Sequence, residues 1–335
     1  MNLIKNKLRK ILFSIMSDRT IDLFYRFYYR IRYPKSMSKK CSYGEDNSDI
    51  TFLVIRPRTD CVEGLMSLFM YVAARLYYAK EKGFIPIIDF ENYKTQYSDE
   101  TMKCKNSWEF YFTQPTEFTL EDVYRSKNVV LSGWDIRFHL PKIFKQDFSQ
   151  SALEALHEII FSSVDFNETV YEKVNAELEY LGLNCEKTLA LYMRGTDYAA
   201  LKPAGHPIQP TVDQSVEVVE EYLKKYDIEK IFLVTEDGMI YDKIKSIYGE
   251  KCVTVSFDTF VHGYVGKHYL SQDKSVEEIS ESPYIRGMNY LIKLIIMSKC
   301  SYFIGGNTMG SWAACIFSAK RDITKYIFDL GTYGK

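Results

Sequence analysis

The chain has 335 residues, 46% of them hydrophobic and 26% charged, with a formal net charge of −1. This composition excludes a disordered chain, and the length suits two hydrophobic cores better than one, so we expect a soluble protein of two domains. The seven cysteines form no C-x-x-C pair, which argues against a disulfide framework or a structural zinc site and favours a reducing, cytoplasmic compartment.

Residues 1–40 form a basic N-terminal segment. They carry eleven lysines and arginines against two aspartates, which gives +9 and leaves −10 for the remainder. The opening MNLIKNKLRKILFSIM has the apolar spacing of an amphipathic helix, but its apolar run is shorter than the ~18 residues that a membrane-spanning helix needs. Two interpretations remain open: a helix lying on an anionic membrane surface at the inner face of the cell membrane, or a helix packed on the protein body with its basic face in water.

Residues 41–185 are expected to form the first domain. The pattern predicts strands at 50–57, 84–90 and 128–134, and helices at 62–83, 151–164 and 167–182. A second alternation fills residues 186–335, with strands at 188–194, 231–237, 251–257, 302–306 and 325–330, and helices at 212–226, 239–249, 287–300 and 311–319. Strands that alternate with helices predict two parallel sheets, each covered by helices.

Three strand ends of the second domain are polar and rich in glycine: MRGTDY (193–198), VTEDG (234–238) and IGGNTMGSW (304–312). Each alone is also explained as a turn or a helix cap. In parallel sheets, however, ligands bind at the carboxyl ends of the strands. The glycine loop offers backbone N–H groups, two hydroxyls and a helix N-terminus, which suit an anion, and Arg194 can supply the two-pronged contact that a diphosphate favours.

These residues resemble a known family. LYMRGTDY resembles the His-x-Arg-Arg-Thr/Gly-Asp motif of the fucosyltransferase superfamily, and LKPAGHPIQP, IFLVTEDG and GGNTMGSWAA resemble bacterial relatives associated with surface-polysaccharide synthesis. The resemblance covers roughly residues 188–314, and in the first domain it rests on residues 64–93. It implies a GT-B fold, in which two Rossmann-like domains face a cleft, with GDP-fucose held by the C-terminal domain and the acceptor mainly by the other.

The resemblance also implies roles for single residues. Arg194 would contact the donor diphosphate, and Asp197 would fix the arginine loop. The other donor-binding residues would be Thr196, Glu236 and Asp237, the last two near the nucleoside, and the loop residues Gly306, Asn307, Thr308 and Ser311. Two positions depart from the motif: Tyr192 stands in place of its histidine, which leaves the donor base and sugar open, and Gly195 stands in place of its second arginine.

The mechanism follows from charge. Breaking a sugar–phosphate bond leaves negative charge on the diphosphate, and the sequence contains no Asp-x-Asp with which to hold a metal there. We therefore predict inverting, metal-independent transfer without a cofactor, in which cationic side chains and backbone dipoles stabilise the leaving group. A base must also take the proton of the acceptor hydroxyl; Glu63, Asp197 and His206 are the three candidates.

The predicted function is sugar transfer, fucose from GDP-fucose being preferred, to a glycan or lipid-linked glycan during surface-polysaccharide synthesis. The alternative is a non-catalytic module that binds a nucleotide sugar or another anion. A nucleic-acid-binding protein is disfavoured, because the acidic remainder of the chain does not extend the basic surface that a phosphate backbone requires.

Overall fold

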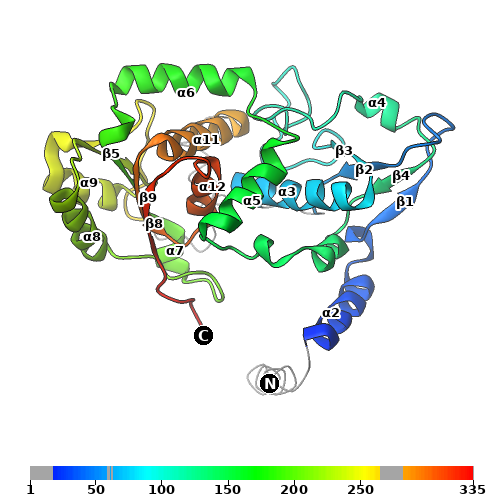
Figure 1. Cartoon of the computed structure of the whole chain (residues 1–335), viewed down its shortest axis with the longest axis horizontal. Helices are drawn as coiled ribbons and strands as arrows, with labels where there is room; N and C mark the ends of the chain where they lie inside the picture. Colours follow the sequence, from blue (N-terminus) through cyan, green and yellow to red (C-terminus); the bar gives the residue numbers. More distant parts are fainter. Residues whose placement is uncertain (1–17, 59–60, 62, 265–281, 335) are drawn as a thin grey trace.

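The computed structural model describes residues 18–58, 61, 63–264 and 282–334. Two sheets, each built mainly from parallel strands, lie at opposite ends of the molecule with helices between and around them (Figure 1). The strand order is β1-β4-β2-β3 in the first sheet and β7-β6-β5-β8-β9 in the second. The predicted α/β class with two parallel sheets is confirmed.

The first sheet is centred on β2 (Phe52–Ile55), whose four residues are all buried. It pairs in parallel with β3 (Ile85–Ile88) and β4 (Val129–Leu131), whereas β1 (Lys39–Cys41) runs antiparallel to β4. Helix α3 (Leu65–Lys82) connects β2 to β3. It ends at Gly83, whose φ of 64° lies in the left-handed region that glycine adopts without strain.

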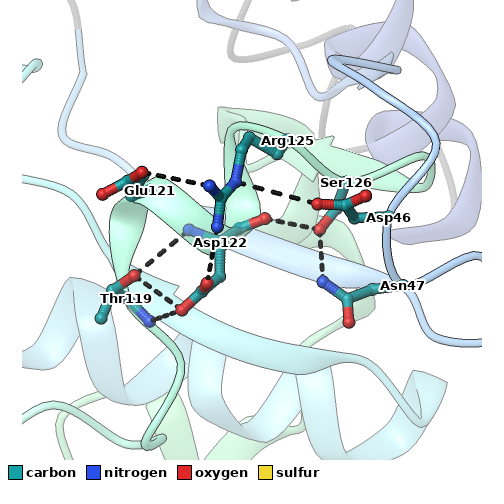
Figure 2. Close-up of polar contacts among 7 residues, drawn as sticks. All are labelled: Asp46, Asn47, Thr119, Glu121, Asp122, Arg125 and Ser126. Carbon is teal, nitrogen blue, oxygen red and sulfur yellow. Dashed lines mark hydrogen bonds and ion pairs between the residues drawn. The ribbon is translucent and has the colours of Figure 1, made fainter.

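A polar cluster at the edge of this sheet ties the short helix α4 (Leu120–Val123) to the chain before β2 (Figure 2). Thr119 and Asp122 form a capping box at the start of the helix. The guanidinium of Arg125 pairs with Asp46, Glu121 and Asp122. These contacts are satisfied within the cluster, so we interpret them as structural.

In the second sheet all five strands are parallel: β5 (Thr188–Tyr192), β6 (Lys230–Val234), β7 (Cys252–Val253), β8 (Tyr302–Gly306) and β9 (Thr324–Phe328). Strand β5 lies in the centre between β6 and β8 and is buried along its whole length. The principal helices of this half are α8 (Val212–Lys225), α9 (Gly238–Tyr248), α11 (Pro283–Lys299) and α12 (Met309–Phe317). Helix α11 starts four residues earlier than its apolar pattern predicts, because Ser282 caps it and Pro283 occupies its first turn.

The two halves share one hydrophobic core. Helices α5 (Gln150–Phe161) and α6 (Glu168–Leu181) follow the first sheet in sequence, but they pack on α12 and α11 of the second half. The core cluster accordingly runs from Leu53 to Ala319, and the rings of Phe69 and Phe317 meet with centroids 5.4 Å apart. The sheets are therefore held in a defined arrangement by apolar packing, and the expected boundary at residue 185 remains a prediction.

Helix α2 (Asp18–Arg32) lies at the N-terminal end of the described chain and projects from the body (Figure 1). One face docks on the 3-10 helix η2 (Trp134–His139): the rings of Tyr29 and Trp134 are 4.1 Å apart, and Arg26 Nη2 donates to the Phe138 carbonyl at 3.0 Å. The opening segment 1–17, for which the amphipathic helix was predicted, lies outside the described residues. No helix among the described residues is long and apolar enough to cross a membrane.

The remaining described elements are short. They are α7 (Thr196–Leu201) and the 3-10 helices η1 (Pro34–Ser36), η3 (Lys142–Phe144), η4 (Cys185–Lys187) and η5 (Gly249–Lys251).

Candidate active site

Arg194 is held at the carboxyl edge of the second sheet by a carboxylate from the neighbouring strand. Arg194 follows β5, Glu236 follows β6, and the two strands pair in parallel, so their ends lie side by side. Arg194 Nε lies 3.1 Å from Glu236 Oε1. The same oxygen accepts hydrogen bonds from Gly195 N at 3.2 Å and Thr196 Oγ1 at 3.0 Å. Glu236 therefore positions the whole loop that carries the arginine.

Asp237 fixes the next turn of this loop. Its Oδ2 accepts from Thr196 N at 2.9 Å, while its Oδ1 accepts from Met239 N at 2.9 Å and caps helix α9. Thr196 has a φ of 35°, which is unusual for a β-branched residue, and these bonds hold it there. Glu236 and Asp237 thus both fix the loop, and the same part for Asp197 stays a prediction. Asp197 belongs to α7, but its side chain lies outside what the structure describes; a contact of Glu236 or Asp237 with the nucleoside stays a prediction.

Gly195 has a steric reason for carrying no side chain. A Cβ at this position would lie 2.7 Å from Asp237 Cγ and closer still to Oδ2. The arginine that the family motif places here does not fit beside the Asp237 cap.

The glycine loop after β8 is braced by its own hydroxyls. Ser311 Oγ donates to the Gly306 carbonyl at 2.6 Å, and Thr308 Oγ1 accepts from Ser311 N at 3.1 Å at the start of α12. Thr308 and Ser311 are buried. The Oδ1 of Asn307 is buried without a hydrogen-bond partner among the described residues, so it suits a donor group on a ligand. Phosphate contacts by Gly306, Asn307, Thr308 and Ser311 stay predictions.

Two tyrosines connect this loop to Arg194. The hydroxyls of Tyr192 and Tyr290 are 3.2 Å apart, and a Cβ at Gly310 would come within 2.6 Å of both. Burial raises the pKa of Tyr192, and the positive charge of Arg194 acts in the opposite direction. Arg194 therefore lies next to the hydroxyl pair on which Gly310 packs, and the buried Tyr192 contributes packing where the family motif has histidine.

The first half of the chain reaches the same place through Tyr97. Its hydroxyl accepts from Leu65 N at 2.9 Å, at the start of α3. Burial raises the pKa of Tyr97, whereas the charges of Arg286 and Arg194 lower it. Arg286 comes from the first turn of α11 and donates through Nη2 to the Gln96 carbonyl at 3.0 Å. The Arg286 guanidinium lies 5.8 Å from the Tyr97 ring centre.

The candidate bases Glu63 and His206 flank this arrangement. The Glu63 carboxylate pairs with Arg58, and its carbonyl accepts from Gln96 Nε2 at 2.6 Å. His206 Nδ1 lies 3.4 Å from the hydroxyl of Tyr198, whose ring lies 4.8 Å below the Arg194 guanidinium. His206 is therefore connected to Arg194 through Tyr198, and the main-chain carbonyl of Glu63 is connected to Arg286 through Gln96. The choice of base remains a prediction.

Comparison with known proteins gave matches among solved structures alone; no protein-family model and no curated protein matches the sequence. NodZ from Bradyrhizobium is 13% identical, with a TM-score of 0.47 over 85% of this chain and 97% of that one. The POFUT1 apo-form is 10% identical (TM-score 0.49; 85% and 99%), and a mutant of Arabidopsis thaliana FUT1 in complex with GDP is 9% identical (0.47; 84% and 71%). All three are fucosyltransferases. At these identities and TM-scores, the likeness assigns no activity to this chain.

Arg286 is a charged residue of the site that the sequence analysis did not predict. It stands in the first turn of an apolar helix, where an arginine is ordinarily solvated. Its contact with Gln96 joins residues 190 positions apart in the chain, so local sequence patterns do not predict this contact. Only the packing of α11 between the two halves brings it to Tyr97.

Among the residues that the structure describes, no three His, Cys, Asp or Glu side chains gather as ligands of a metal ion would. Metal-independent transfer stays a prediction, and the test below includes it.

Proposed function

We propose that the chain transfers fucose from GDP-fucose to a glycan acceptor in surface-polysaccharide synthesis. The observation that supports this most directly is that Arg194 and the glycine loop lie at the carboxyl ends of two paired strands, β5 and β8. The Arg286 guanidinium lies 5.8 Å from the ring centre of Tyr97. Strand ends of this kind bind ligands in parallel sheets, and a guanidinium group beside a helix N-terminus suits a diphosphate.

The charges account for the chemistry. As the sugar–phosphate bond breaks, Arg194 and Arg286 would stabilise the charge that grows on the leaving diphosphate. Because Arg194 is already held by Glu236 at 3.1 Å, it needs little reorganisation when the charge appears. The acceptor hydroxyl would lose its proton to Glu63, Asp197 or His206 and attack the sugar from the opposite face, which inverts the configuration.

A second candidate function is a module that binds a nucleotide sugar without turnover. One contact favours it: the carboxylate of Glu63 is engaged by Arg58, so it is less available to contact an acceptor hydroxyl. Slow hydrolysis of the donor without acceptor separates the two, because only a catalyst cleaves the sugar–phosphate bond.

A thermal-shift screen with GDP, UDP, dTDP, CMP and their sugars tests the proposal. At about 100 times its dissociation constant, GDP or GDP-fucose should stabilise the fold by ~2.7 kcal/mol, which raises the Tm of a chain of 335 residues by roughly 4 °C. Hydrolysis of GDP-fucose should then proceed in excess EDTA. Stabilisation by a guanine nucleotide without hydrolysis would favour the binding module, and hydrolysis that needs added Mn²⁺ or Mg²⁺ would contradict metal independence.

We further propose that α2 rests on an anionic membrane surface at the inner face of the cell membrane, where a lipid-linked acceptor would be available. Tyr29 docks on the body, and residues two positions away lie on nearly the opposite side of a helix with ~3.6 residues per turn. Phe27 and Ile31 are there, and Leu23 lies about one turn before Phe27; the exposed fractions of Leu23, Phe27 and Ile31 are 59%, 67% and 66%. An apolar stripe flanked by arginines is typical of a helix lying in a membrane interface.

Replacing Leu23, Phe27 and Ile31 by Gln should weaken binding to phosphatidylglycerol vesicles by at least about 100-fold, because each apolar side chain buried in the interface contributes ~1.5 kcal/mol or more. The matched control replaces three apolar residues exposed elsewhere, Tyr180, Met239 and Ile247, by Gln. Vesicle flotation measures binding, and higher salt should reduce that of the unaltered protein. If both triple variants lose vesicle binding equally, or neither loses it, α2 packs on the protein body and does not bind the membrane.

A further inference from the structure

A basic cavity of about 620 Å³ lies in the first half of the molecule, and neither Arg194 nor Arg286 is among its lining residues. Its walls come from the carboxyl ends of three parallel strands: Arg56 follows β2, Lys94 follows β3 and Ser132 follows β4. The segment from Pro34 to Lys39, which connects α2 to β1, closes it. The cavity therefore has the position in its sheet that ligand sites occupy in α/β proteins.

The charge of the cavity has one sign. Its described lining residues include no Asp or Glu and five cations: Lys35, Lys39, Arg56, Arg58 and Lys94. Arg58 pairs with Glu63 and Lys94 with Glu100, the latter at 3.1 Å in an exposed pair that contributes little. Concentrated positive charge in a concave wall raises the local concentration of anions.

Arg56 is built into the wall. Its Nε donates to the Ser132 carbonyl at 3.0 Å and its Nη2 to the Met37 carbonyl at 3.2 Å, while its guanidinium lies 5.3 Å from the Tyr93 ring centre. These partners are neutral, so they orient the positive charge without cancelling it. Beside it, Ser38 Oγ is buried without a hydrogen-bond partner among the described residues, although Ser38 N donates to Asp135. A fixed cation and an unused hydroxyl suit the oxygens of a phosphate.

The cavity also lies close to the end of α2, because only Tyr33 separates that helix from the lining residues Pro34 and Lys35. A membrane surface under the apolar stripe of α2 would bring lipid phosphates to the entrance. We propose that this cavity binds the phosphate or diphosphate at the head of a membrane lipid, and that its physiological source is the lipid-linked sugar on which the enzyme acts. This inference rests on the proposed function, since it names the class of acceptor.

The test uses exposed lysines, so that folding is not at stake. Replacing Lys35, Lys39 and Lys94 by Gln removes three charges from the cavity and leaves the Arg56 contacts in place. The control replaces Lys80, Lys103 and Lys127 by Gln. These lysines are exposed on the same half of the molecule, so the control has the same net charge as the cavity variant. Calorimetry measures how the cavity variant and the control variant bind geranyl diphosphate and geraniol, which lacks phosphate. Flotation measures how both variants bind phosphatidylglycerol vesicles.

Geranyl diphosphate should bind the control like the unaltered protein and bind the cavity variant at least about tenfold more weakly, because three nearby cations are gone; geraniol should not bind. Loss confined to geranyl diphosphate supports the lipid-linked sugar as source, and an equal loss on phosphatidylglycerol supports a phospholipid headgroup. If both variants bind geranyl diphosphate with equal affinity, the proposed phosphate site in the cavity is wrong. GDP titration separates the two ideas: GDP binding without geranyl diphosphate binding contradicts this inference alone, and the reverse contradicts the proposed function.

Discussion

Arg194→Ala should fold normally and bind GDP at least about tenfold more weakly than the unaltered protein. A hydrogen bond to a charged group contributes ~1.5–3 kcal/mol, and ~1.4 kcal/mol corresponds to a factor of ten in affinity. Turnover should fall further, by about 100-fold or more, because the arginine also meets charge that grows only in the transition state. Arg286 remains near Tyr97 in the variant, so some affinity for the diphosphate should persist.

Two further variants make this result specific. Arg194→Lys should restore only part of the affinity, because an ammonium lacks the two-pronged geometry of guanidinium. Arg125→Ala removes an arginine whose partners are the carboxylates of the polar cluster in Figure 2, and it should leave GDP binding unchanged. Calorimetric titration measures affinity and circular dichroism reports folding. If the Arg194→Ala protein folds and binds GDP with undiminished affinity, the residues after β5 form a turn with no part in binding.

Gly195→Ala should have the second large effect. The new Cβ would overlap the Asp237 carboxylate, so Asp237 must move away from Thr196 N and from the start of α9. Overpacking of this kind costs roughly 1–3 kcal/mol of the free energy of unfolding. Because the same movement displaces the loop that carries Arg194, GDP binding should weaken by about tenfold as well.

The control for this variant is Gly64→Ala. Gly64 has a φ of −63°, and a Cβ there meets nothing within 4 Å, so its free energy of unfolding should change by less than ~1 kcal/mol. Urea unfolding measures both. In an Asp237→Gly background, which removes the obstructing carboxylate, Gly195→Ala should cost much less. A cost that stays the same in that background would show that the overlap with Asp237 is not the cause.

Local sequence patterns predict the helices and strands of this chain and the sheet edge at which they present polar residues. Continuous apolar runs predict buried strands such as β5, and the alternation of strands with helices predicts parallel sheets. Parallel pairing brings the ends of β5, β6 and β8 to one edge, so Arg194, Glu236 and the glycine loop were expected together. These inferences succeed because period, turns and caps depend on residues close in the chain.

The choice of polar groups that face one another depends on tertiary packing. It pairs Arg194 with Glu236, uses Thr308 and Ser311 to brace their own loop, and brings Arg286 beside Tyr97. It also assembles the basic cavity from segments that precede β1 and follow β2, β3 and β4. Each of these contacts depends on how helices and strands pack across a shared core. That packing is set by the summed burial of many apolar side chains, which no single motif records.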